Sequence, residues 1–334
     1  MKKIYIIIFS LFLSSVIVSS CKKDEDQKDA EFKNDFIKKT LMPLIVGEKI
    51  EFAYGMGTQS GKLTNVKAVA NIPGATGTFW EPFTWRTTTG GVNVSKVVAK
   101  DMSTVGNTST AVIIDTNATT LRYFYTIPEA SRGQNVSFEF SAQNSLGQTV
   151  SVKTPTYRVT KMDMVRNITL VGSATGARYF SIADGKAYTL AEVEANNLSA
   201  KIDFVYAYAA TITPTTTAYP YGHSFISPSV TGYFPAGFTI NPAWTKATTL
   251  MERKIGNTLY DGQLKNDANV GIYVDELDLA QQEFNGSAAF AITMTQDAGI
   301  FMKTADGRHV AFIYINSVNN GTSTAVISMK RLAL

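Results

Sequence analysis

Residues 136–141 read Val-Ser-Phe-Glu-Phe-Ser, and the architecture of the chain can be worked out from this stretch. Apolar side chains alternate with polar ones, as they do in a strand with one buried face. Residues 144–147, Asn-Ser-Leu-Gly, supply a turn, and residues 150–159 return as a second strand. Pro155 in the returning strand lacks a backbone N–H, which indicates a sheet edge or a break there. The stretch therefore predicts an antiparallel hairpin.

Similar runs recur at short intervals on the N-terminal side, each ended by Gly, Asn, Pro or Ser. Seven short strands within about 110 residues are typical of an immunoglobulin-like sandwich. The chain has one Cys, so no disulfide crosses this region, and a domain of this size can be stable through its core alone. We therefore predict an immunoglobulin-like β-sandwich over residues 44–160. Its other strands are expected at 49–54, 63–70, 94–99, 111–114 and 121–127.

The second domain is predicted to cover residues 161–334, beginning with a charged stretch at 161–166 that contains no Gly or Pro. Domain boundaries fall in exposed segments that few contacts cross, so the two halves are expected to be separable. Residues 310–315 are apolar on both faces, which predicts a central strand covered on both sides. Turn sequences at 305–308 and 319–321 predict hairpins next to it. Further strands are expected at 167–171, 178–182, 201–208, 288–294, 299–303 and 325–330.

Two short helices are predicted in the second domain. Thr189 and Glu192 have the spacing of a capping box, which opens a helix that runs through Asn197. Asp275 is the expected N-cap of the second helix, because acidic residues follow it, and Gly286 ends that helix. The chain is therefore predicted to be mainly β, with an N-terminal immunoglobulin-like β-sandwich followed by an α+β domain on an antiparallel sheet.

The composition excludes several classes of protein. Charged residues make up 17% of the chain, and 31 Lys and Arg against 27 Asp and Glu leave a net charge of +4. A nucleic-acid binder needs a basic stripe, and a disordered chain needs a higher net charge and less apolar content than 45%. One Cys and two His argue against a thiolate cluster or a multi-histidine zinc site. We therefore predict no nucleic-acid partner, no metal and no cofactor.

The N-terminal segment has the layout of a secretory signal. Two lysines precede an apolar run at residues 4–18, which is too short for a comfortable transmembrane helix. The run ends in Val-Ser-Ser-Cys at 18–21, which resembles the lipobox of bacterial lipoproteins. The resemblance implies cleavage of the signal peptide, residues 1–20, and lipidation of Cys21 with several acyl chains. More than one chain is needed for stable anchoring, so the expected partner of Cys21 is a lipid bilayer.

Residues 22–26, Lys-Lys-Asp-Glu-Asp, resemble the acidic export signal of Bacteroidetes-type surface lipoproteins. The resemblance implies a lipid-anchored outer-membrane protein that faces the cell exterior; the alternative is a generic charged tether. Residues 21–43 are expected to form a flexible tether after the lipidated Cys. Phe32, Phe36 and Ile37 within it could form one face of a short helix that docks on the body.

Part of the second domain resembles known sequences. Residues 179–188 and 201–206 are similar to a C-terminal domain of Bacteroidetes outer-membrane surface lipoproteins of unknown function. The order of signal, tether, immunoglobulin-like module and distal β-rich domain also resembles glycan-binding lipoproteins of the starch-utilisation-system type. The resemblance implies binding of a glycan or related nutrient beside an outer-membrane importer complex. The resemblance offers no catalytic residues that could be assigned in this chain.

Two aromatic segments are candidate ligand-binding regions, because sugars bind through flat apolar faces and hydroxyl edges. Residues 79–85 include Trp80 and Trp85; the alternative is that a tryptophan fills the sandwich core. Residues 219–244 contain four prolines and are expected to form a long loop, not a helix or a regular strand. This loop either binds a ligand or folds over the sheet as a hydrophobic lid. Its candidate ligand-binding residues are Tyr219, Tyr221 and Tyr233, and Trp244 is expected to behave as core.

Catalysis is the alternative to simple binding. Glycosidases need two carboxylates, and Asp203 lies among apolar neighbours, where burial would raise its pKa. Asp203 could equally accept hydrogen bonds from a backbone loop, so no catalytic residue is assigned. The preferred hypothesis is a non-catalytic surface-exposed lipoprotein. The alternatives are a glycoside hydrolase that uses Asp203 with a second carboxylate, and an adhesin-like structural subunit.

Overall fold

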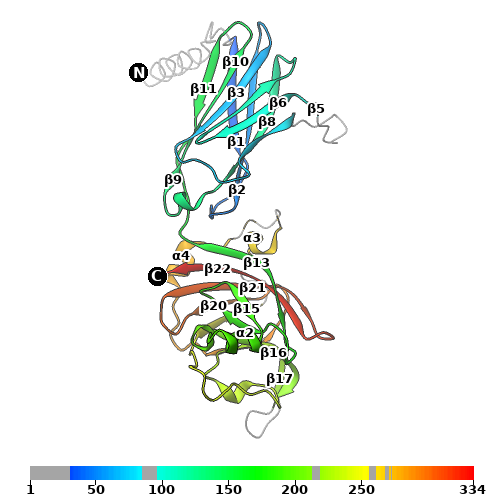
Figure 1. Ribbon diagram of the computed structural model, residues 1–334, viewed down its shortest axis with the longest axis vertical. Coiled ribbons are helices and arrows are strands. Elements are labelled where there is room, and N and C mark those ends of the chain that lie inside the picture. The colour runs from blue at the N-terminus through cyan, green and yellow to red at the C-terminus, as the bar shows by residue number, and fades with distance from the viewer. Residues whose placement is uncertain (1–30, 85–95, 213–218, 256–260, 268–270, 272) are drawn as a thin grey trace, which may run out of the picture.

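The computed structural model describes residues 31–84, 96–212, 219–255, 261–267, 271 and 273–334. Two β-rich domains follow one another along the long axis of the molecule (Figure 1). Neighbouring strands pair antiparallel in every sheet, so the predicted mainly β, antiparallel class is confirmed. Within the described residues, no helix has the length and apolar character needed to cross a membrane.

The first domain is a sandwich of two five-stranded sheets, which confirms the predicted β-sandwich. One sheet has the order β1-β2-β8-β4-β5 and the other β11-β10-β3-β7-β6, while β9 and β12 form a short ribbon. A 3-10 turn at Glu129–Ser131 follows β8. The strands are β1 (Phe32–Lys38), β2 (Lys49–Thr58), β3 (Leu63–Ala70), β4 (Phe79–Thr84), β5 (Lys96–Val97), β6 (Ala99–Val105), β7 (Thr108–Ile113), β8 (Ala118–Thr126), β9 (Asn135–Val136), β10 (Phe138–Asn144), β11 (Thr149–Lys153) and β12 (Tyr157–Arg158).

Aromatic rings fill the space between these two sheets. Trp80 on β4 is 1% exposed, and its indole N–H donates to the carbonyl of Ser109. The Trp80 ring lies 4.9 Å from Tyr123 and 5.9 Å from Phe140, measured between ring centres. Tyr54 stacks on Phe140 at 5.2 Å. Because removal of one such buried ring costs about 3–5 kcal/mol, this cluster is a main source of the domain's stability.

Part of the segment predicted as a tether belongs to the first domain. β1 pairs with β2 along its whole length, so residues 32–38 are an edge strand and not part of a flexible tether. Phe32 is buried in the core and Phe36 packs against it, so the helix proposed for this segment is wrong. The sequence left this open because three apolar residues among charged ones satisfy a helical spacing and a strand spacing alike.

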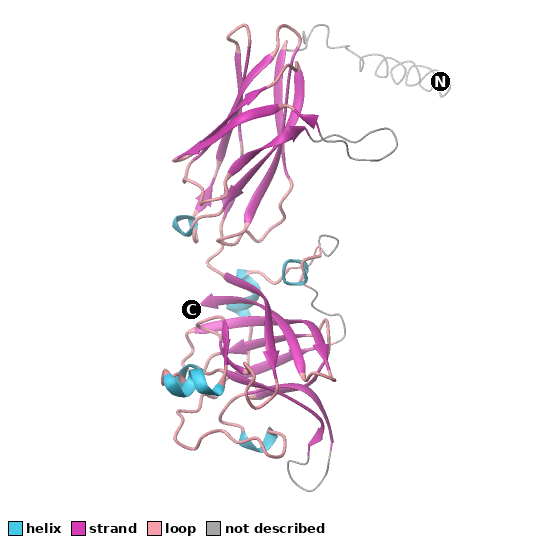
Figure 2. Cartoon of the chain, turned by 45° about the vertical axis from the view of Figure 1, so that its right-hand side comes forward, coloured by secondary structure: helices cyan, strands magenta, loops and turns pink. Residues whose placement is uncertain are grey.

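The second domain packs two five-stranded antiparallel sheets face to face (Figure 2). The orders are β13-β22-β21-β20-β18 and β15-β14-β16-β17-β19. Their facing sides share one apolar core, to which the first sheet contributes Ile313 and Met329 and the second Phe204 and Phe225. The elements are β13 (Asp163–Val171), β14 (Tyr179–Ser181), β15 (Lys186–Tyr188), α2 (Leu190–Ala195), β16 (Phe204–Ile212), β17 (Tyr219–Ile226), β18 (Leu250–Lys254), α3 (Gly262–Lys265), α4 (Glu276–Gln281), β19 (Phe290–Met294), β20 (Gly299–Lys303), β21 (His309–Asn319) and β22 (Thr324–Ala333), with 3-10 turns at Ser199–Lys201 and Thr231–Tyr233.

The helix starts predicted for this domain are present, but α2 ends at Ala195 and α4 at Gln281, before the predicted ends at Asn197 and Gly286. Thr189 and Glu192 form a reciprocal capping box at α2, and Asp275 caps α4 with its side chain. β21 is covered on both faces: Ile313 lies in the core between the sheets, while Phe312 and Tyr314 lie in a second cluster that includes residues of α3 and α4. The predicted central strand is therefore confirmed.

The aromatic segment at 219–244 is part strand and part cover, so the single long loop predicted for it is wrong. β17 pairs with β16 and β19 and accommodates Pro220 near its start. Residues 227–249, called the covering segment below, then lie on the outer face of this sheet, where Tyr179 and Val205 are buried. The proline count suggested irregular backbone, but one Pro at the start of a strand is tolerated. The rings that cover the sheet are Phe234, Phe238 and Trp244.

The two domains meet in a packed junction. Ile45 of the first domain and Met162 of the connection are fully buried in an apolar cluster whose other members belong to the second domain. Arg166 forms a bidentate ion pair with Glu48, at 2.8 and 3.1 Å, and donates to the carbonyl of Gln263. The charged stretch at the boundary is therefore held by both domains, and the expectation that few contacts cross it is wrong.

Candidate functional site

Two of the predicted ligand-binding residues lie in the core. Trp80 is 1% exposed in the first domain, and Tyr221 on β17 is 0% exposed in an apolar cluster with Ala207 and Ile226. A side chain without exposed surface cannot contact a ligand directly, so the binding role predicted for Trp80 and Tyr221 is wrong. Strand alternation turns both rings inward, and this outweighs the polar residues and prolines beside them.

The other predicted residues are placed only in part. Trp85 and Cys21 lie outside the described residues, as does the side chain of Tyr219, whose backbone begins β17. Tyr233 is half-buried, and its ring stacks on Phe290 with 3.8 Å between the ring centres. A binding role for these tyrosines and for Trp85 stays a prediction.

Asp203, the carboxylate considered for catalysis, is buried beside the end of the covering segment. The N–H of Ile182 donates to its Oδ2 at 2.7 Å, and the hydroxyl of Thr249 donates to its Oδ1 at 3.4 Å. Burial raises the pKa of Asp203 to about 7, against the opposing effect of these donors. Both oxygens therefore accept hydrogen bonds from the surrounding backbone and hydroxyl groups. This is the structural alternative that the sequence left open.

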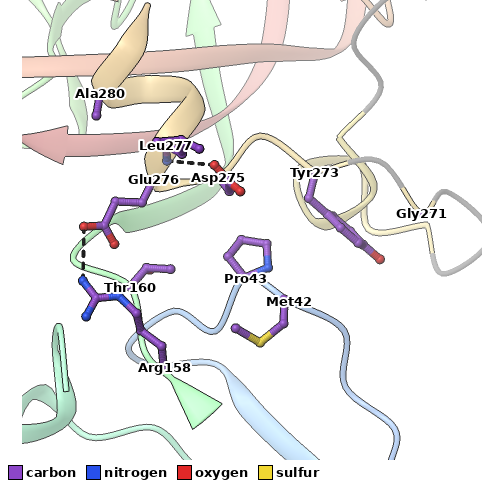
Figure 3. Close-up of a pocket in the computed structure, with 10 residues that line it drawn as sticks. All are labelled: Met42, Pro43, Arg158, Thr160, Gly271, Tyr273, Asp275, Glu276, Leu277 and Ala280. Atoms are coloured by element: carbon purple, nitrogen blue, oxygen red, sulfur yellow. Dashed lines mark hydrogen bonds and ion pairs between the residues drawn. The ribbon is translucent and has the colours of Figure 1, made fainter. Parts of the chain in front are cut away.

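A cleft of about 560 Å³ opens where the two domains meet (Figure 3). Small-molecule sites typically enclose about 300–1,000 Å³ and often lie at domain interfaces. Neither domain forms this cleft alone. The first domain contributes Met42, Pro43, Arg158 and Thr160, and the second contributes Gly271, Tyr273, Asp275, Glu276, Leu277 and Ala280.

One side of the cleft is apolar and accessible. Met42 is 45% exposed and Leu277 is 60% exposed, which are large values for apolar side chains at an inner corner of a protein. Pro43 lies between them in Figure 3, and the ring of Tyr273 lies beside Pro43. An aromatic ring beside aliphatic side chains offers the kind of flat apolar surface on which a sugar ring can stack.

The other side of the cleft is polar. The Arg158 guanidinium lies 3.8 Å from Oε1 of Glu276, and the Arg158 side chain is 56% exposed. Oε2 of Glu276 accepts a hydrogen bond from the N–H of Lys161 at 3.1 Å. Asp275 uses Oδ1 to accept the N–H groups of Leu277 and Asp278. In the part of the chain that the structure describes, no three His, Cys, Asp or Glu side chains are grouped so that they could hold a metal ion.

A buried ion pair holds the segment that carries Tyr273. Nζ of Lys330 on β22 lies 2.6 Å from Oδ2 of Asp261, both side chains are fully buried, and Lys330 also donates to the carbonyl of Val274. Asp261 in turn accepts the N–H groups of Leu264 and Val274. Burial lowers the pKa of Lys330, and the adjacent carboxylate opposes this shift. Lys330 lies 5.6 Å from the centre of the Tyr273 ring, so the pair fixes the cleft wall from within.

The sequence analysis missed the cleft because three separate segments build it, at residues 42–43, 158–160 and 271–280. Asp275 was interpreted as a helix N-cap, which it is, and Glu276 as one of the acidic residues that follow the cap. Met42 and Pro43 were placed in the tether. Cleft residues from the two domains are more than 100 positions apart in sequence, as Arg158 and Glu276 illustrate. No local pattern in a single sequence shows that segments so far apart come into contact.

Two family models match the chain. The model described as "Domain of unknown function (DUF4466)" matches residues 29–159, and the model described as "Domain of unknown function (DUF8576)" matches residues 160–334. The first ends and the second begins within the connection between the two domains described above. A search of curated proteins found no match.

The chain is similar to solved structures. A DUF4466 family protein from Parabacteroides merdae ATCC 43184 is 33% identical, with 91% of this chain and 99% of that chain covered and a TM-score of 0.82. BcpA, the major pilin subunit of Bacillus cereus, is 13% identical over 64% of this chain and 62% of that chain, with a TM-score of 0.28. The first similarity covers both domains, and the second is too low to support any inference.

Proposed function

The chain belongs to the DUF4466 family, and from this premise we propose that it is a non-catalytic, lipid-anchored protein of the outer cell surface that binds a carbohydrate in the junction cleft. An accessible apolar wall facing a polar wall carries the proposal, because sugars present apolar faces and hydroxyl edges to their binding sites. Delivery of the bound glycan to an outer-membrane importer is part of the same proposal.

The path of the chain supports the proposed orientation. β1 begins at Phe32 opposite Thr58 and runs towards the junction, so the chain enters the first domain at the end remote from the second domain (Figure 1). The ten residues after Cys21, 22–31, span at most about 35 Å when extended. A lipid on Cys21 would therefore hold the first domain near the membrane and the junction cleft farther out.

Lipidation and exposure are tested on cells. Cys21→Ala should lose incorporated radiolabelled palmitate and leave the membrane fraction, because no second lipid attachment site is proposed. Protease added to intact cells should digest the parent protein if it faces outward. Equal palmitate labelling of parent and variant, or full protection from the protease, would contradict the anchoring part of the proposal.

Carbohydrate binding is tested with the full-length protein in detergent against a panel of polysaccharides and oligosaccharides. Tyr273→Ala should weaken binding about 10- to 100-fold, as truncation of an interface anchor does, with little change in melting temperature. The comparison variant is Tyr233→Ala, because Tyr233 lies on the covering segment and its ring stacks on Phe290 of β19.

The two tyrosine variants separate the two candidate regions. Loss of binding in Tyr273→Ala alone supports the cleft. Loss in Tyr233→Ala alone would transfer the site to the covering segment, as the sequence analysis suggested. Release of sugar fragments by the parent protein, abolished by Asp203→Asn, would replace the proposal with the glycoside hydrolase alternative.

A further inference from the structure

Resting on the proposed function, we infer that the Arg158–Glu276 ion pair binds one sugar hydroxyl from the cleft side, which makes the cleft selective for neutral sugars over uronic acids and sulphated sugars. The separation of 3.8 Å between guanidinium and carboxylate carries this inference. It is too long for a direct hydrogen bond, but one hydroxyl oxygen beside the pair can lie about 2.8 Å from both atoms, and both groups line the same cleft.

A hydroxyl matches the hydrogen-bonding character of both groups. It accepts a hydrogen bond from the guanidinium, which is a pure donor, and donates one to the carboxylate, which is a pure acceptor. A ligand carboxylate or sulphate can accept from Arg158 but has no hydrogen to give to Glu276. The pair therefore distinguishes a group that both donates and accepts from a group that only accepts.

Each side chain of this ion pair also has a second contact. Glu276 is held by the N–H of Lys161 at 3.1 Å, and Arg158 has a second contact at 3.4 Å to the carbonyl of Gly133. Glu276 is thus held by the connection next to the first domain, and Arg158 within the first domain, so both side chains of the ion pair have a second contact. A ligand hydroxyl that bridges the pair meets groups already in position, so little ordering is needed.

The charge of the cleft acts in the same direction. Asp275 and Glu276 outnumber Arg158 among the lining residues. An acidic sugar would bring a further negative charge against two carboxylates, and like-charge contacts of this kind suppress the wrong ligand. A neutral sugar is not repelled by these carboxylates.

The experiment compares matched ligands on the full-length protein in detergent. The probes are oligosaccharides of glucose and of galactose, and the corresponding oligomers of glucuronic and galacturonic acid, titrated by calorimetry. The parent should bind a neutral member at least tenfold more tightly than its acidic counterpart. Glu276→Gln should reduce this preference about tenfold, because the amide removes the charge and can donate to an anion.

The control is Glu139→Gln, which alters a similar surface glutamate, 3.7 Å from Lys153, in the first domain and away from the cleft. It should leave the preference unchanged. If the parent binds acidic sugars as tightly as neutral ones, or if Glu276→Gln keeps the full preference, the inference is wrong while carbohydrate binding stands. If the parent binds none of the sugars, the proposed function fails and the inference fails with it.

Discussion

The covering segment and the junction cleft both gather apolar side chains, but these side chains have different surroundings. In the covering segment, Phe238 and Trp244 lie 6.5 and 5.3 Å from Tyr179, so the rings mostly contact one another and the sheet beneath. In the cleft, Met42 and Leu277 are about half exposed and face a polar wall. Aromatic density in a sequence therefore indicates packing first. Apolar surface left accessible beside polar side chains is the better sign of a binding site.

The largest expected effect is on the free energy of unfolding, when the buried ion pair behind the cleft wall is broken. Asp261→Ala would leave Lys330 buried without its carboxylate and remove the acceptor for two backbone N–H groups. Breaking one partner of a buried pair costs about 3–5 kcal/mol, so the free energy of unfolding in urea should fall by that amount. Sugar binding should be lost as well, because Tyr273 loses its support.

Glu139→Ala serves as the control for that measurement, since it removes one partner of a solvent-exposed ion pair with Lys153. Such pairs contribute about 1 kcal/mol or less. Equal destabilisation by the two variants would mean that the buried pair does not hold the cleft wall as described.

An intermediate effect is expected beneath the covering segment, where Asp203 is buried. Its folded-state pKa of about 7 lies above the ordinary value of 3.8, so the folded protein binds this proton more tightly than the unfolded chain does. The stabilisation is therefore complete below about pH 4 and is lost as the pH rises through 7. One pKa unit corresponds to about 1.4 kcal/mol, so the parent should lose about 2 kcal/mol or more over this range.

Asp203→Asn should flatten this pH dependence in urea unfolding, because the amide does not titrate and its oxygen can still accept from the N–H of Ile182. Asp306→Asn is the contrasting variant, since hydrogen bonding from Thr304 lowers the pKa of Asp306 and gives the opposite slope. A parent protein whose stability is constant from pH 4 to pH 7 would show that Asp203 is ionised in the fold.

Much of the fold could be predicted because its signals are local. The strand at 63–70 is β3 to the residue, and the capping box of Thr189 and Glu192 forms as expected, since both depend only on neighbours in sequence. Which face of a strand is buried also follows from alternation. Whether Trp80 or Phe79 points inward, however, depends on register against the partner strand, which the heptapeptide at 79–85 does not state.

The site was harder to predict than the fold. Its surface exists only after Met42 and Arg158 of one domain meet Tyr273 and Glu276 of the other, and that meeting is set by contacts such as Arg166 with Glu48. The same residues have convincing local explanations in sequence, as tether, strand end or helix cap. A single sequence shows these local roles, and the shared cleft becomes visible only in three dimensions.

The smallest effect tests whether exposure alone or position in the cleft matters. Leu277 and Leu146 are both exposed leucines, at 60% and 62%, but only Leu277 lines the cleft, while Leu146 lies in the turn after β10. Leu277→Ala should weaken sugar binding by about 1 kcal/mol, roughly fivefold, because a contacting apolar group is lost. Leu146→Ala should leave binding unchanged. Both should keep the parent's free energy of unfolding within about 0.5 kcal/mol, because an exposed leucine contributes little to the core. If calorimetry finds the same affinity for both variants, the apolar wall at Leu277 does not touch the ligand, and the cleft's apolar contact would have to come from Tyr273 and Met42 alone.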